Sequence, residues 1–111
     1  MSDKITYKKH PTVNYWLVGT NGTIYSIKNN RFITGTKTNY GYIRITELKG
    51  RKRFLHRIIM ETYYGHSDLD IDHIDGNKEN NNINNLEYVT TSENVKRAIK
   101  MGLRVYKKKS I

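Results

Sequence analysis

Residues 75–85 are the stretch that most restricts how this chain can fold. They run Asp-Gly-Asn-Lys-Glu-Asn-Asn-Asn-Ile-Asn-Asn, and their single apolar residue, Ile83, is too little for a core element. Asn side chains compete for backbone hydrogen bonds and therefore oppose a helix. Short apolar segments typical of strands flank the stretch at 69–74 and 86–90. The sequence therefore predicts two short strands joined by a long, ordered polar loop.

A helix is predicted directly after the second strand, at about residues 91–101. Thr90 and Glu93 have the spacing of a capping box, so Thr90 is the expected N-cap. The apolar face of this helix consists of Val95, Ala98 and Ile99. Gly102 can adopt the left-handed conformation that ends a helix. The predicted order is strand, polar loop, strand, helix.

An antiparallel β meander is predicted upstream, over residues 15–56. Asn21-Gly22 is a typical pair for a type I′ hairpin turn, in which both central residues have positive φ. Further turns are expected at Asn29-Asn30 and Lys49-Gly50. The predicted strands cover residues 15–18, 23–27, 31–33 and 42–46.

A second helix is predicted over residues 54–64, between the meander and the polar loop. Its apolar residues recur at helical spacing: Leu55, Ile58, Ile59 and Tyr63. Gly65 is the expected end of this helix. With 111 residues, the chain has the length of one compact domain with short arms.

The charge balance points to a polyanionic partner. Twenty Lys and Arg residues against ten Asp and Glu give a net charge of +10, which favours DNA, RNA or an acidic membrane surface. The chain has no cysteine, which excludes disulfides and a thiolate zinc site. It shows neither a membrane-length apolar run nor a signal-peptide core. A cytoplasmic protein without a membrane partner is therefore expected.

Asp72, His73 and Asn94 are the candidate chemical residues. Asp72 and His73 lie on the first strand of the predicted hairpin, and Asn94 lies in the first turn of the following helix. If that helix packs across the hairpin, a carboxylate, an imidazole and an amide oxygen can converge. Oxygen ligands suit a hard divalent cation, and a histidine can take a proton from an attacking water near neutral pH. The set therefore favours phosphodiester hydrolysis.

These residues carry a resemblance to a known family. The motifs are His56-Arg57, Asp72 through Asn77, Asn81-Asn82, Asn85-Leu86, Val89-Thr90 and Ser92-Glu93-Asn94. In these motifs, residues 54–94 resemble the HNH (ββα-metal) module of phage and intron-encoded homing endonucleases. Residues 15–48 are similar, less specifically, to the β-rich module that often precedes it.

The resemblance implies a metal-dependent DNA endonuclease. It implies that His73 is the general base and that Asp72 and Asn94 hold one divalent cation, Mg²⁺ or alternatively Mn²⁺. Asn85 corresponds to the middle letter of the HNH motif, and we count it with the catalytic residues as a brace that helps to orient the histidine. Many relatives continue into a C-terminal helix-turn-helix segment, whereas this sequence stops after a basic tail, so recognition of a long site is not expected.

The expected fold is α+β: an antiparallel β meander, one helix, an HNH module and a basic tail. Residues 1–53 are expected to form a β-rich DNA-binding region, residues 54–102 the nuclease module, and residues 103–111 the tail. Double-stranded DNA is the expected partner. A monomer would nick one strand, whereas a symmetric homodimer could cut both.

Two groups of basic residues flank the candidate site and are expected to bind the DNA backbone. The first group contains Arg51, Lys52, Arg53, His56 and Arg57, and the second contains Lys96, Arg97, Lys100 and Arg104. For His56, packing at the start of the first helix is the alternative role. Single aromatic residues, Trp16, Tyr40 and Tyr42, are expected in the core.

Other interpretations stay open at this point. The chain could be a DNA-binding protein that keeps the fold but cuts weakly, or a module that binds or cuts RNA. A calcium loop around Asp72 is disfavoured, because the acidic cluster lacks the Glu that an EF-hand has at its twelfth position. His10 and His66 are expected at the surface, and Asn85 is the single loop asparagine given a role.

Overall fold

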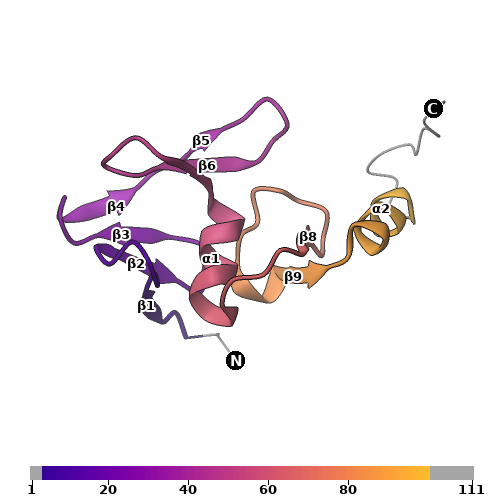
Figure 1. The fold of residues 1–111 in the computed structure, drawn as a ribbon, viewed down its shortest axis with the longest axis horizontal. Coiled ribbons are helices and arrows are strands. Elements are labelled where there is room, and N and C mark those ends of the chain that lie inside the picture. The colour runs from indigo at the N-terminus through magenta and orange to yellow at the C-terminus, as the bar shows by residue number, and fades with distance from the viewer. Residues whose placement is uncertain (1–3, 101–111) are drawn as a thin grey trace.

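A computed structural model describes residues 4–100 of the chain, with side chains up to residue 96. Figure 1 shows a central helix with strands on one side and a hairpin and second helix on the other. The strands are β1 (Tyr7–Lys9), β2 (Trp16–Gly19), β3 (Ile24–Ser26), β4 (Arg31–Ile33), β5 (Thr36–Lys37), β6 (Ile43–Thr46), β7 (Lys52–Phe54), β8 (Asp70–His73) and β9 (Leu86–Val89). The helices are α1 (Leu55–Tyr64), the short 3₁₀ helix η1 (Ile83–Asn85) and α2 (Thr91–Lys100).

The predicted α+β class is confirmed, but the meander divides into two sheets. Strands β1–β4 form one antiparallel sheet and β5–β7 form a second. In β3, Ile24 and Ser26 are both buried, so these two residues share the face toward the core. Strands β1 and β5 were not predicted, since two or three exposed residues carry no apolar alternation.

The turn between β2 and β3 is not the expected type I′ turn. The Gly19 N–H donates to the Thr23 carbonyl at 2.7 Å, which leaves three residues, Thr20–Gly22, in the turn. Within it only Gly22 has positive φ, at +88°. A three-residue hairpin loop ends on such a left-handed residue, whereas a type I′ turn needs two of them.

Helix α1 lies at the centre of the molecule (Figure 1) and contributes several residues to the core. Its Ile58 and Ile59 are fully buried and join one apolar cluster with Trp16 of β2, Ile71 of β8 and other strand residues. Full burial of each such side chain contributes about 1.5–3 kcal/mol. As predicted, the helix ends at Gly65, where φ is +83°.

The hairpin and helix after α1 follow the predicted order. Strands β8 and β9 pair antiparallel, with Asp70 opposite Val89 and His73 opposite Leu86. The loop between them is ordered and lies beside α1 (Figure 1). No helix among residues 4–100 has the length and apolar character needed to cross a bilayer.

The capping box at the start of α2 is confirmed. The Thr90 N–H donates to Glu93 Oε1 at 3.0 Å, and the Glu93 N–H donates to Thr90 Oγ1 at 3.2 Å. The expected helix end at Gly102 and the basic tail lie outside the described residues.

Candidate active site

His73 is the last residue of β8, and its side chain is almost fully buried. Because side chains alternate along a strand, Ile71 and His73 share the face toward α1, whereas Asp72 points to the opposite face. The His73 ring meets the His56 ring of α1 edge-on, with 5.1 Å between the ring centroids. The strand end thus places the imidazole against α1 and the neighbouring carboxylate on the other side.

A hydrogen bond from the polar loop determines which ring nitrogen of His73 carries the proton. Nε2 of His73 lies 2.8 Å from Oδ1 of Asn81, and the Asn81 amide group donates to the Lys78 carbonyl at 3.3 Å. Since Oδ1 can only accept, Nε2 is the donor and Nδ1 of a neutral ring keeps its lone pair. Nδ1 has no hydrogen-bond partner among the described side chains and backbone. The ring therefore presents one basic nitrogen.

Burial keeps this ring uncharged at neutral pH. Desolvation is the largest effect and lowers the pKa of His73, although the Asn81 hydrogen bond and the Asp72 charge oppose it. The pKa of His56 falls to about 3, mainly through desolvation and secondly through repulsion by His73. A neutral imidazole is the form that can accept a proton from water.

Asn85 closes the polar loop, as the brace interpretation expects. Its amide group donates to Asp75 Oδ1 and to the Asn80 carbonyl, both at 2.9 Å, and its Oδ1 accepts from the Asp75 N–H at 3.0 Å. The Ile74 N–H donates to the Asn85 carbonyl at 2.8 Å. One side chain thus ties the two ends of the loop together directly after His73.

Asn81 touches the candidate base directly, but it is not among the site residues predicted from the sequence. Its side chain is 5% exposed, and it lies in a run of three asparagines of which none had been assigned a role. The available signal was its place four residues before Asn85 in a loop that must fold back over β8. That signal is weak, because the contact with His73 depends on how the loop closes.

Asp72 and Asn94 are the candidate oxygen donors for a cation. Asp72 is 9% exposed on β8, and Asn94 is half-buried in the first turn of α2, whose backbone approaches β8. Among the described residues, no three His, Asp or Glu side chains gather in a way that could hold a metal ion. One carboxylate and one amide oxygen suit a hard cation and leave positions for phosphate and water.

Shallow grooves run beside Tyr42, Phe54 and His56, whose rings form an aromatic cluster with His73. One, of about 280 Å³, is lined by Arg44, Arg51, Lys52, Arg53, Phe54, His56, Arg57 and Glu61. Another, of about 400 Å³, shares Arg44 and Phe54 and includes Tyr40 and Tyr42. Trp16 is in the core as predicted, but the prediction for Tyr40 is wrong, since it is 80% exposed on the β5–β6 turn.

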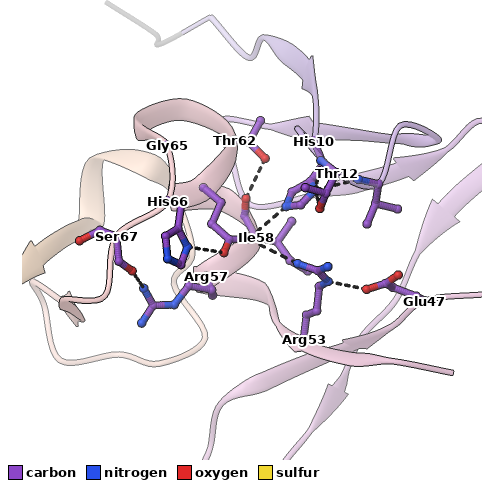
Figure 2. A network of polar contacts seen from close by, with 12 residues as sticks. His10, Thr12, Glu47, Arg53, Arg57, Ile58, Thr62, Gly65, His66 and Ser67 are labelled. Carbon is purple, nitrogen blue, oxygen red and sulfur yellow. Dashed lines mark hydrogen bonds and ion pairs between the residues drawn. The ribbon is translucent and has the colours of Figure 1, made fainter. Parts of the chain in front are cut away.

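The basic residues beside these grooves differ in what they contact. Arg53 forms ion pairs with Glu47 and Glu61, and Arg57 donates to the Ser67 carbonyl at 2.9 Å (Figure 2). Arg51 and Lys52 line the first groove and are exposed to solvent, and Lys96 of α2 is exposed as well. The side chains of Arg97 and Lys100, and all of Arg104, lie outside the described residues.

His10 is not at the surface as expected, because it is 2% exposed. Its Nε2 donates to Glu61 Oε1 at 3.1 Å, and its Nδ1 accepts from the backbone N–H groups of Thr12 and Val13 (Figure 2). The partner in α1 is 51 residues away, so local sequence gave no sign of it. His66 is exposed, as predicted.

A strand, a polar loop, a second strand and a helix, with a buried histidine at the first strand's end, define a ββα module. Residues 53–96 match the model of the HNH endonuclease family. Over this segment the chain is therefore similar to the HNH endonucleases.

Similar proteins extend the likeness beyond the module. DNA endonuclease I-HmuI of Bacillus phage SP01 is 35% identical over 93 residues, which are 79% of this chain and 53% of the relative. The uncharacterized HNH endonuclease L245 of Acanthamoeba polyphaga mimivirus is 30% identical over 98 residues, which are 84% of this chain and 30% of the relative. This chain therefore spans about half or less of the length of these curated relatives.

A solved structure shares the fold of almost the whole chain. It is described as DNA binding and cleavage by the HNH homing endonuclease I-HmuI, and it matches with a TM-score of 0.81 at 30% identity. The match covers 91% of this chain and 62% of that chain. The likeness therefore includes the β-rich region before α1.

Proposed function

We propose that this chain acts as a metal-dependent DNA endonuclease that hydrolyses phosphodiester bonds. The observation that carries the proposal is the buried imidazole of His73, held at Nε2 by Asn81 and next in sequence to Asp72. The match of residues 53–96 to the HNH endonuclease family supports the reaction class. The name of the relative I-HmuI, a DNA endonuclease, supports DNA as the substrate.

His73 is the general base in this proposal. Its Nε2 donates to Asn81, so Nδ1 is the atom that would receive the proton of the attacking water. The lowered pKa keeps Nδ1 unprotonated at neutral pH. Asn85 would hold the loop in the conformation that places Asn81 over the ring.

Asp72 and Asn94 would bind one divalent cation, Mg²⁺ or alternatively Mn²⁺. When bound, such a cation polarises the scissile phosphate and stabilises the departing oxygen. The two residues supply hard oxygen donors from β8 and from the first turn of α2.

Double-stranded DNA would lie along the basic groove beside His56. Arg51 and Lys52 are exposed there, whereas Arg53 and Arg57 support the groove through contacts inside the protein. Phosphate contacts by lysine and arginine release counterions, so binding should weaken steeply with salt. Residues 1–53 would act as the DNA-binding region and residues 54–102 as the nuclease module, as a monomer that nicks or a dimer that cuts both strands.

Supercoiled plasmid incubated with the chain and Mg²⁺ tests the proposal directly. We expect nicked or linear product, which is lost in EDTA and lost in His73→Ala although the variant still binds DNA. His66→Ala is the matched control, because that exposed histidine touches none of the site residues. Undiminished cutting by His73→Ala or in chelator contradicts the mechanism. Binding without cutting by the unsubstituted chain would leave a DNA-binding protein with an HNH fold.

A further inference from the structure

We propose that Asn81 is a positioning residue for His73, and that the β2–β3 turn holds Asn81 in place. This inference rests on the proposed function, because it concerns how the general base is aimed. It joins two parts of the chain that are more than 50 residues apart in sequence, the turn at 20–22 and the loop at 81–83.

The orientation of the Asn81 amide is fixed from both sides. If the amide were reversed, its oxygen would face the Lys78 carbonyl and its NH₂ group would face Nε2 of His73. Two carbonyl oxygens cannot bond to each other, so the reversed amide would leave its own buried oxygen and the Lys78 carbonyl facing each other without a donor. Asn81 therefore accepts from His73 and excludes the tautomer in which Nδ1 carries the proton.

Packing limits the rotation of the His73 ring on its other sides. The His56 ring of α1 lies 5.1 Å away and the Tyr42 ring lies 6.1 Å away, measured between ring centroids. His56 is itself stacked on Phe54 at 5.5 Å. The hydrogen bond from Asn81 and this aromatic packing together define one direction for Nδ1.

The β2–β3 turn in turn supports the backbone of Asn81. The Ile83 N–H donates to the Thr20 carbonyl at 2.8 Å. A methyl group placed on Gly22 would lie 2.8 Å from the Asn81 carbonyl oxygen and 3.0 Å from its carbonyl carbon, so the two backbones are in tight contact. This turn lies outside residues 53–96, the segment that matches the HNH family. The module thus depends on the first sheet for the alignment of its own histidine.

The tautomer of His73 is the readout that tests Asn81. In the full chain labelled with ¹⁵N-histidine, two-bond ¹H–¹⁵N spectra at alkaline pH should show His73 with its proton on Nε2. Asn81→Ala should give a mixture of tautomers at His73 and leave the signals of His10 and His66 unchanged. Asn82→Ala is the control, since Asn82 caps η1 through the Asn84 N–H at 2.9 Å without reaching His73.

Cutting should follow the tautomer. Asn81→Ala should lower kcat about 10- to 100-fold, the usual cost of removing a partner that orients a reacting histidine, with the Kd for DNA unchanged. Asn82→Ala should lower neither. A proton on Nδ1 of His73 in the unsubstituted chain overturns the proposal, and this measurement needs no variant to fold.

A pair of glycine variants tests the support from the turn. Gly22 and Gly50 have nearly the same positive φ, +88° and +93°, but a methyl group on Gly50 meets nothing within 4 Å. Both alanine variants therefore carry similar backbone strain, and only Gly22→Ala presses on Asn81. We expect mixed His73 tautomers in Gly22→Ala alone, and identical spectra for the two variants refute the role of the turn.

The spectra also separate this inference from the proposed function. If the chain cuts no DNA but Asn81 still fixes the tautomer of His73, the positioning role of Asn81 stands and the proposed endonuclease function is refuted. If the chain cuts DNA but the His73 tautomer is unchanged in Asn81→Ala, the endonuclease function stands and the positioning role of Asn81 is refuted.

Discussion

Two buried histidines, His10 and His73, are used in opposite ways in two regions of this molecule. Both side chains are buried, and desolvation is the largest cause that lowers the pKa of each. At His10 both ring nitrogens are satisfied inside the protein, by Glu61 on one side and by backbone N–H groups on the other (Figure 2). At His73 the protein satisfies Nε2 through Asn81.

The difference teaches how a buried histidine can be recognised as structural or chemical. A ring with both nitrogens bonded to protein holds elements together, and His10 joins the segment after β1 to α1. A ring with one nitrogen bonded to protein and the other directed away from protein partners is oriented, and its second nitrogen stays available to accept a proton.

The largest effect should come from His73→Ala. Removing the general base should lower the cleavage rate by about 10²- to 10⁴-fold. It also leaves the buried Oδ1 of Asn81 without its donor, which should lower the free energy of unfolding by about 1–3 kcal/mol. Single-turnover plasmid cleavage and urea unfolding measure the two quantities. A large loss of stability with a small loss of rate would place His73 with the structural histidines.

His10→Ala should lower the stability without lowering the cleavage rate. It leaves Glu61 and the Thr12 and Val13 N–H groups without their buried partner, which should lower the free energy of unfolding by about 1–3 kcal/mol. Cutting per folded molecule should stay unchanged. Urea unfolding and cleavage well below the melting temperature check both parts, and a rate loss at full folding would show that His10 reaches the site.

Acid should destabilise the chain through its buried histidines, with His56 as the clearest case. The pKa of His56 is about 3 in the folded chain against 6.5 for an unperturbed histidine. Between these values the unfolded chain holds more protons, so the free energy of unfolding falls as pH falls, by about 2 kcal/mol from pH 7 to pH 5. In His56→Leu, urea unfolding should show this pH dependence reduced by that amount. An unchanged pH dependence would mean that His56 is protonated in the folded chain.

The smallest effects should separate the neighbouring cations Lys52 and Arg53. Lys52 is exposed, so Lys52→Ala should weaken DNA binding modestly and reduce the slope of log K against log salt by about 1. Arg53 is paired with Glu47 and Glu61, so Arg53→Ala should lower stability and leave the slope unchanged. Equal slopes for both variants would show that this groove does not contact the DNA backbone.

Local pattern was sufficient for most of the elements. Helix α1, the β8–β9 hairpin and the capping box of α2 were predicted within one residue at most ends, because apolar periodicity and Thr90–Glu93 spacing act within a few residues. The β2–β3 turn was predicted with the wrong type, since Asn-Gly fits both a two-residue and a three-residue loop. The register of the strands decides between them.

The residues of the candidate site that stand in a sequence motif could be predicted, whereas the residue whose contact depends on how the loop closes could not. Asp72, His73, Asn85 and Asn94 stand in a recognisable order along the chain. Asn81 is one of six asparagines in the polar loop, and its sequence neighbours do not distinguish it. It contacts His73 because the loop folds back between β8 and the β2–β3 turn.

By itself, the sequence determined the ββα order, the resemblance to the HNH module and the candidate chemical residues, since all of these depend on residue type and short spacing. Only the tertiary structure decided which histidine is structural, which basic side chains form ion pairs within the protein and which asparagine holds the imidazole. Those outcomes depend on contacts over long sequence separations, such as His10 with Glu61 and Gly22 with Asn81. Burial and satisfied hydrogen bonds become defined only when the segments pack.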